Sequence, residues 1–224
     1  MLKAAQGLKI NQHSLSELVL DPLRLDIIRG VYKPGSHLVE RTLAEQYGVS
    51  RGPIREALTE LEREGLVQIL PRRGAIVTEL SPREAWEIYT LRGHLEQLAV
   101  KQCEPQLTKD RIDKLLKLVQ EMEELEEADI VEAVMYDLRF HRAVVQASGN
   151  NTLIRTHRTL DAKVGACFLL VTRHLGYSPT DMAERHRPLA EAIAQRDIDR
   201  AQRLAKSHWH NTAEQFLKTP SGGG

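Results

Sequence analysis

The chain has 224 residues, enough for two domains of ordinary size, and 42% of them are hydrophobic. The longest uninterrupted apolar run, residues 166–171, is far shorter than the ~20 residues that span a bilayer. No signal peptide is visible, and two cysteines make no disulfide framework, so a membrane protein or a disulfide-rich secreted scaffold is excluded and a cytoplasmic location is expected. The formal net charge is zero, so nucleic-acid binding would need local clusters of basic residues.

The N-terminal part of the chain predicts a helix followed by a helix-turn-helix. Residues 14–29 carry apolar side chains at helical spacing and stop at Gly30, a suitable residue for a helix C-terminus. Residues 38–58 then read as two short helices joined by a tight turn, in which Gly48 supplies the left-handed backbone angle.

The second of these short helices has the features of a recognition helix. We expect Ser50 to cap it through the N–H of Gly52, with Pro53 in the first turn, where its missing N–H is no loss. Arg51 and Arg55 are one turn apart and therefore project together. Two guanidinium groups at the start of an exposed helix suit contacts to bases in the major groove.

A hairpin with a basic tip follows the recognition helix. Residues 66–70 and 75–78 predict two short strands, joined by a turn that contains Arg72, Arg73 and Gly74. Such a wing suits contact with phosphate or with the minor groove. A small α/β module with incidental surface arginines is the alternative. The predicted DNA contacts are Arg41, Ser50, Arg51, Gly52, Pro53, Arg55, Arg72, Arg73 and Gly74.

The rest of the chain predicts a second, all-helical domain. Ser81 and Glu84 form a capping box, which places the domain boundary at residue 80. The expected helices cover 82–103, 109–126, 129–147, 151–175, 181–195 and 198–217. The fold class is therefore mainly α: a winged helix-turn-helix in residues 1–80, a helical bundle in 81–217, and a disordered tail in 218–224.

A constellation of histidines lies in the predicted bundle. Asp137 and His141 are four residues apart, so they share one helix face, with Cβ atoms about 5–6 Å apart. His186 and His208 lie on two later helices, and the apolar spacing around His186 turns it inward. Three imidazoles and one carboxylate suit Zn²⁺ or another borderline divalent metal. An isolated Asp–His pair on a helix surface is the simpler alternative.

These motifs together resemble those of the GntR family of bacterial transcription regulators, and the likeness covers about residues 15–215. The signature of that family is similar to residues 43–66, with Ser50, Arg51, Pro53 and Arg55 near its centre. The helical part resembles the FCD subgroup, the FadR-type effector domain. The resemblance implies a divalent metal ion (zinc, nickel or manganese) held by Asp137, His141, His186 and His208, and a small carboxylate as effector.

Arg92 allows two interpretations. It lies four residues before Glu96 on a predicted helix, a spacing typical of an intrahelical salt bridge. The family resemblance implies instead that Arg92 binds an acidic effector in the helical domain.

The sequence as a whole indicates a transcription regulator and not an enzyme. We expect a homodimer that binds a palindromic double-stranded DNA operator and responds to a small organic acid. One alternative is a metal sensor, in which the ion itself is the signal. Another is a metal-dependent hydrolase, but no separate general base is evident and such an enzyme needs no winged helix.

Overall fold

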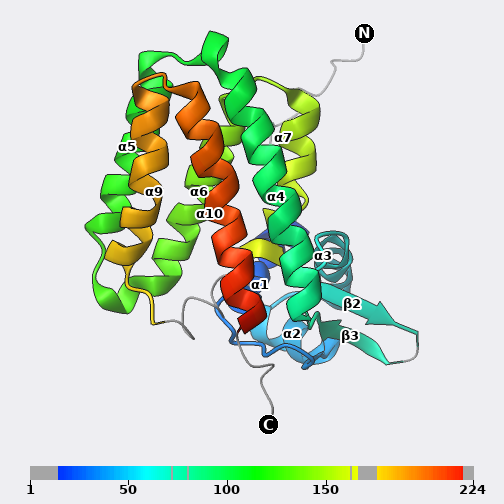
Figure 1. Cartoon of the computed structure of the whole chain (residues 1–224). Coiled ribbons are helices and arrows are strands. Elements are labelled where there is room, and N and C mark those ends of the chain that lie inside the picture. The colour runs from blue at the N-terminus through cyan, green and yellow to red at the C-terminus, as the bar shows by residue number, and fades with distance from the viewer. Residues whose placement is uncertain (1–14, 72, 80, 162, 166–175, 219–224) are drawn as a thin grey trace, which may run out of the picture.

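The computed structural model describes residues 15–218, except 72, 80, 162 and 166–175 (Figure 1). A small winged helix-turn-helix lies at one end of a larger helical domain. Within the described residues, no helix is both long and apolar enough to cross a membrane.

The N-terminal domain is built from three helices and a small sheet. Its helices are α1 (Leu15–Ile28), α2 (Glu40–Tyr47) and α3 (Arg51–Arg63). Gly48 ends α2 with φ 66°, the left-handed conformation that glycine adopts without strain, so the turn forms as predicted. Leu43, Ile54 and Leu61 point into one core with residues of α1 and the sheet, and each is at most 2% exposed.

The wing is an antiparallel hairpin of β2 (Val67–Leu70) and β3 (Gly74–Val77). A third strand, β1 (His37–Leu38), pairs with the other edge of β3, which gives the order β1-β3-β2. We did not predict β1, because two residues carry no readable alternation. The hairpin projects beside α3, as Figure 1 shows.

The second domain is a bundle around one long helix, α4 (Pro82–Cys103), which begins next to the wing (Figure 1). The bundle continues with α5 (Lys109–Glu123), α6 (Ile130–Gln146), α7 (Asn151–Arg158), α9 (Pro179–Ala194) and α10 (Ile198–Lys218). Short 3₁₀ helices cover Glu104–Gln106 and Glu127–Asp129. α10 runs antiparallel to α4, and Gly93 permits the close approach, since a Cβ there would lie 3.1 Å from Trp209 Cβ.

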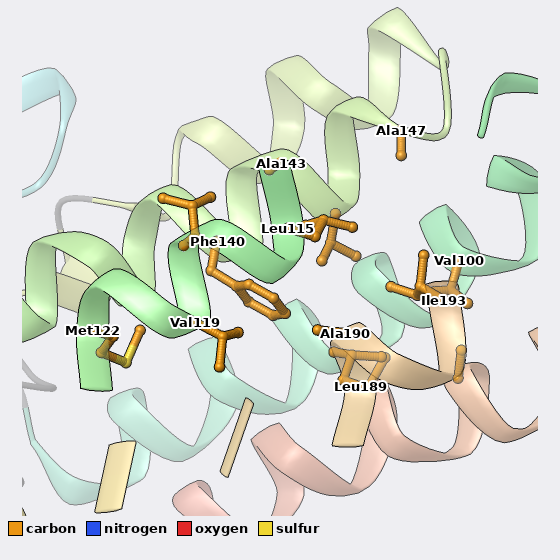
Figure 2. Packing of buried hydrophobic residues seen from close by; sticks show 14 of the residues in the cluster. Val100, Leu115, Val119, Met122, Phe140, Ala143, Ala147, Leu189, Ala190 and Ile193 are labelled. Atoms are coloured by element: carbon orange, nitrogen blue, oxygen red, sulfur yellow. The ribbon is translucent and has the colours of Figure 1, made fainter. Parts of the chain in front are cut away.

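Aliphatic and sulfur-containing side chains fill the interior of the bundle, as the low aromatic content requires. Figure 2 shows Leu115, Val119 and Met122 of α5 facing Phe140 of α6 and Leu189 of α9. Each of these side chains is at most 2% exposed. Because α6 and α9 are fixed by this core, the polar residues on their neighbouring faces are held in place as well.

The two domains share a packed seam at the end of α1. Ile27 belongs to the core of the winged helix, whereas the adjacent Ile28 packs in the core of the helical domain. A Cβ at Gly165 would lie 3.6 Å from Ile28 Cδ1, so the two are in close contact. Lys163 lies across Gly65, where an added Cβ would overlap its side chain.

Several helix ends differ from the sequence prediction. The helix expected over 151–175 stops at Arg158, where a turn interrupts it, and residues 166–175 lie outside the described residues. The helix expected from 181 begins at Pro179, because Ser178 caps it in a capping box with Asp181. Lys218, expected in the disordered tail, is the last residue of α10, and the tail residues 219–224 lie outside the described residues.

Candidate DNA-binding surface and metal centre

The predicted recognition residues lie on the exposed face of α3. Arg51 is exposed at the first position of the helix, and the Arg55 side chain is 64% exposed. Arg55 is not free, because its Nε donates to both carboxylate oxygens of Glu40 at 2.8 and 2.9 Å. A base contact by Arg55 therefore requires exchange of this ion pair.

The start of α3 differs from the prediction in one respect. Ser50 occupies the N-cap position with extended backbone angles, but its side chain makes no capping hydrogen bond. The expected bond to the N–H of Gly52 is therefore wrong. Pro53 lies in the first turn of α3 as predicted. The exposed Ser50 hydroxyl thus remains available at the N-terminus of the recognition helix.

Two further basic groups flank this helix. Arg41 on α2 is 73% exposed, with its Nε 4.0 Å from Glu45 Oε1. Arg73 is exposed in the wing turn, next to Gly74 with φ 78°. Arg72 lies outside the described residues. Because both Arg41 and Arg73 are exposed, each can contact DNA without breaking a buried interaction.

The four predicted metal ligands come together inside the bundle. α6 supplies Asp137 and His141, α9 supplies His186, and α10 supplies His208. One donor atom from each lies within 4.8 Å of the other three. The first three residues are 0–1% exposed. His208 is intermediate in exposure as a whole residue, but its ring is enclosed, with centroids 5.0 Å from His141 and 4.6 Å from His186.

The ring orientations turn the Nε2 atoms of His141 and His186 toward each other. His141 Nδ1 lies 2.7 Å from Glu96 Oε2, and His186 Nδ1 lies 2.6 Å from the carbonyl oxygen of Met182. Both partners are acceptors, so both Nδ1 atoms donate. In neutral rings the two Nε2 atoms then carry lone pairs, although they are only 3.1 Å apart. A shared cation, either a metal ion or a proton on one of the two rings, relieves the repulsion between these lone pairs.

Asp137 completes this donor set. Its Oδ1 lies 2.8 Å from His186 Nε2 and 3.6 Å from His141 Nε2, but neither carboxylate oxygen accepts a well-aligned hydrogen bond from the described residues. Its only ion-pair partners in the described part of the chain are these two imidazoles. A buried carboxylate of this kind needs a positive charge beside it, and a metal ion supplies one.

The pKa shifts show how the metal-free site would compensate. Burial opposes the charge on His141, but the carboxylates of Glu96 and Asp137 outweigh it and raise its pKa to about 9. Burial also opposes ionisation of Asp137, yet His141 and His186 hold its pKa well below the ordinary value. Burial, aided by the charges of His186 and His141, keeps the pKa of His208 low. A proton on His141 thus takes the place of an ion, and metal binding would release it.

A second layer of buried charges surrounds His141. Glu96 Oε1 accepts from His157 Nε2 at 3.0 Å and from Arg92 Nε at 3.2 Å. Arg92 also donates through Nη1 to Asp161 at 2.8 Å, and its guanidinium carbon lies 4.7 Å from the centre of the Trp209 ring. The expected intrahelical Arg92–Glu96 pair is therefore present, and it is fully buried.

The roles of Glu96, His157 and Asp161 in this layer were not predicted from the sequence. His157 contacts the Glu96 carboxylate and is not among the four clustered residues. Its spacing to Asp161 is the same four residues that drew attention to Asp137 and His141. That repeated spacing, from His157 on α7 to Asp161 just beyond its end, was the available signal.

Comparison with known proteins bears on both domains. Residues 15–77 match the family model of bacterial regulatory proteins of the gntR family, and residues 87–211 match that of the FCD domain. The chain belongs to the GntR family, FCD subgroup. It is a DNA-binding transcription regulator and not an enzyme, so the hydrolase alternative is set aside.

Relatives of this regulator agree over most of its length. The helix-turn-helix regulator YdhC of Bacillus subtilis is 32% identical over 199 residues, 86% of each chain. The transcriptional repressor GlaR of Escherichia coli is 29% identical over 83% of this chain and 88% of its own. The solved structure of E. coli McbR/YncC has the same fold, with a TM-score of 0.79 at 23% identity, over 92% of this chain and 99% of that one.

Proposed function

We propose that this protein is a ligand-responsive repressor that binds a palindromic operator as a homodimer and senses a small organic acid through a metal-containing helical domain. The observation that carries the sensing part is the buried group of Asp137, His141, His186 and His208, with donor atoms within 4.8 Å of one another. The repressor assignment draws on relatives such as GlaR, which is named a repressor. A protein that acts on chromosomal DNA works in the cytoplasm.

The four side chains fit a zinc, nickel or manganese ion. His141 and His186 would bind it through Nε2, because their Nδ1 atoms are already engaged, and Asp137 would bind through its carboxylate. When bound, the ion supplies a fixed positive charge that attracts an acidic ligand. Four protein ligands close a tetrahedral site, so an effector carboxylate would require five or six ligands around the ion.

Arg92 is the residue that we propose for the effector. Its guanidinium lies over the Trp209 ring, and that ring is 4.5 Å from the His141 ring, centroid to centroid. Its Nη2 is buried and donates no hydrogen bond to any described residue. A carboxylate bound near the metal can accept from this nitrogen. Because Arg92 is fully buried, the site must open for the acid to enter.

The winged helix would bind DNA in two ways. We assign base contacts to Arg51 and Arg55 and backbone contacts to Arg41, Arg72, Arg73 and the residues around Ser50, Gly52, Pro53 and Gly74. The exposure of Arg51, Arg55 and Arg41 supports these roles. One such domain reads only a few base pairs, so two half-sites related by two-fold symmetry are expected.

The dimer interface that we propose lies on α4. Leu91 and Leu98 are two turns apart on its outer face and are 48% and 41% exposed. Exposed leucines at this spacing form an apolar stripe along one helix, and a second copy of the chain would bury it. We divide the chain accordingly into a DNA-binding part, residues 1–80, and a sensing and dimerisation part, residues 81–217.

The test is metal content followed by response. We expect the purified protein to hold about one divalent ion per chain, and the triple variant His141→Ala/His186→Ala/His208→Ala to hold none while its winged helix stays folded. His210→Ala is the matched control, because that imidazole is on α10 but its side chain is 60% exposed. A thermal-shift screen of small organic acids should identify effectors only for the protein with metal. Unchanged metal content in the triple variant would refute the site.

A metal sensor remains the second candidate, favoured by one observation. Three of the four proposed ligands, Asp137, His141 and His186, are only 0–1% exposed, as a site that responds to the ion alone requires. Operator affinity measured with and without metal, in the absence of any organic acid, separates the two. A change with metal alone supports the sensor, whereas a change only on addition of an acid supports the proposal above.

A further inference from the structure

We propose that Glu96 is a positioning residue of the metal centre, which fixes His141 with Nε2 turned toward the ion. The inference rests on the metal site proposed above and adds a residue outside the ligand set. Its basis is the 2.7 Å contact between His141 Nδ1 and Glu96 Oε2, with both side chains 0% exposed. A carboxylate can only accept here, so the proton lies on Nδ1.

This contact determines which ring nitrogen of His141 faces the proposed metal site. An imidazole has two nitrogens, and the proton on one leaves the other as the ligand. With Nδ1 bound to Glu96, only Nε2 faces Asp137 and His186. Without Glu96 the ring is free to change its tautomer and its rotation. The same task at His186 falls to the carbonyl of Met182. A charged acceptor holds its donor more strongly than a carbonyl does and makes the ligand more basic.

Glu96 is itself held in place. Its other oxygen, Oε1, accepts from His157 Nε2 at 3.0 Å and from Arg92 Nε at 3.2 Å. Both partners are buried, at 0–1% exposure, so the carboxylate is fixed from two sides. The ligand helix α6 is thereby tied to α4 and α7, although neither α4 nor α7 provides a ligand. α4 begins directly after the wing, so a displacement of Glu96 would be carried toward the DNA-binding domain.

A purely structural role for Glu96, as the ion-pair partner of Arg92, predicts something different. It would affect the stability of the bundle and leave the affinity for metal unchanged once folding is accounted for. Metal affinity of the folded protein therefore separates the two roles.

The test compares Glu96→Gln with Glu87→Gln, a matched control that makes the same change on the exposed face of α4. Gln keeps the volume of the side chain but removes its charge and one acceptor. Ni²⁺ is the probe, with its affinity measured by competition with a chelator on protein shown to be folded. We expect Glu96→Gln to bind Ni²⁺ about 10–100-fold more weakly than wild type. We expect Glu87→Gln to match wild type.

A second measurement uses the wild-type protein and needs neither a variant nor a metal. Nitrogen-detected NMR of the imidazole rings should show a His141 Nδ1–H that exchanges slowly with solvent, because it is buried and bound to Glu96. Equal Ni²⁺ affinity in folded Glu96→Gln, or a His141 ring without a proton on Nδ1, would overturn the proposal. Absence of Ni²⁺ binding by wild type, with the Nδ1–H present, would instead refute the metal site and leave the hydrogen bond standing.

Discussion

Charged side chains act in opposite ways in the two domains. In the winged helix, Arg41 and Arg55 are 73% and 64% exposed, and their carboxylate partners Glu45 and Glu40 are 71% and 36% exposed. Such pairs contribute only about 0–1 kcal/mol, so a phosphate or a base can replace the carboxylate. In the helical domain, Arg92 pairs with Glu96 and Asp161 at 0–3% exposure. An exposed arginine–carboxylate pair is therefore exchangeable, whereas a buried pair of the same chemical kind holds its two side chains in place.

The largest effect is expected from removal of Asp161. Asp161→Ala leaves the buried Arg92 without one partner and the half-exposed Arg142 without its own. Breaking a buried pair in this way costs about 3–5 kcal/mol of unfolding free energy. Urea denaturation measures it, with Asp113→Ala as control, because the Asp113 side chain is 57% exposed and pairs with Lys109 in water. Equal unfolding free energies for the two variants would show that the buried pair contributes no more to stability than an exposed one.

The next effect concerns operator binding and leaves stability unchanged. Arg51→Ala and Arg55→Ala should each weaken binding to an operator selected from random DNA by about 1–3 kcal/mol and relax its sequence preference. The control is Arg63→Ala, at the far end of α3 and 69% exposed. Fluorescence anisotropy gives the affinities. If the double variant at Arg51 and Arg55 still binds with wild-type affinity, α3 is not the reading helix.

The capping box that begins α4 should make a smaller contribution that depends on pH. The Ser81 hydroxyl and then the Ser81 N–H donate to Glu84, which lowers the pKa of that carboxyl below its usual 4.5. Ser81→Ala should cost about 1 kcal/mol near neutral pH. Because the folded pKa is the lower one, the stabilisation is present above pH 4.5 and is lost as pH falls through the folded value. Urea titrations at several pH values should show the two proteins converge in acid, whereas Ser207→Ala should show no such trend.

The smallest effect is expected from Arg41→Ala, which tests whether Arg41 contacts the DNA backbone or a base. Arg41→Ala should weaken binding to all sequences alike, and the slope of log affinity against log salt should become less steep by about 1. Lys114→Ala, an exposed charge on α5, should leave that slope unchanged. A loss confined to the preferred operator would instead make Arg41 a base-reading residue.

Local signals allowed much of the fold to be predicted. α4 has the predicted bounds, because Ser81, Pro82 and Glu84 mark its start and a proline-containing turn follows Cys103. The turn at Gly48 follows from the backbone angle that only glycine adopts easily. The four residues predicted as metal ligands lie together. The four-residue spacing placed Asp137 and His141 on one helix face, and the apolar spacing around His186 turned it inward, whereas no such spacing was used for His208.

The remaining features depend on contacts between distant segments. Glu96 contacts His141 and His157, which are 45 and 61 residues away in the sequence. The spacing of apolar residues within a helix cannot predict a contact over such a distance. The end of α7 at Arg158 was hidden, because the apolar spacing continues past it. Strand β1 exists only because β3 offers an edge for it. The Ser50 hydroxyl shows that a preferred capping residue can hold the position without making the bond.

The seam at Ile27 and Ile28 has a practical consequence for protein engineering. A chimera that joins this winged helix to another effector domain at residue 80 would carry Ile28 away from its contact with Gly165. It would place a buried isoleucine against a surface that was not shaped for it. The proposed junction at residue 80 and the packing contact of Ile28 are therefore 52 residues apart along the chain, and exchangeable modules have to be cut with both in mind.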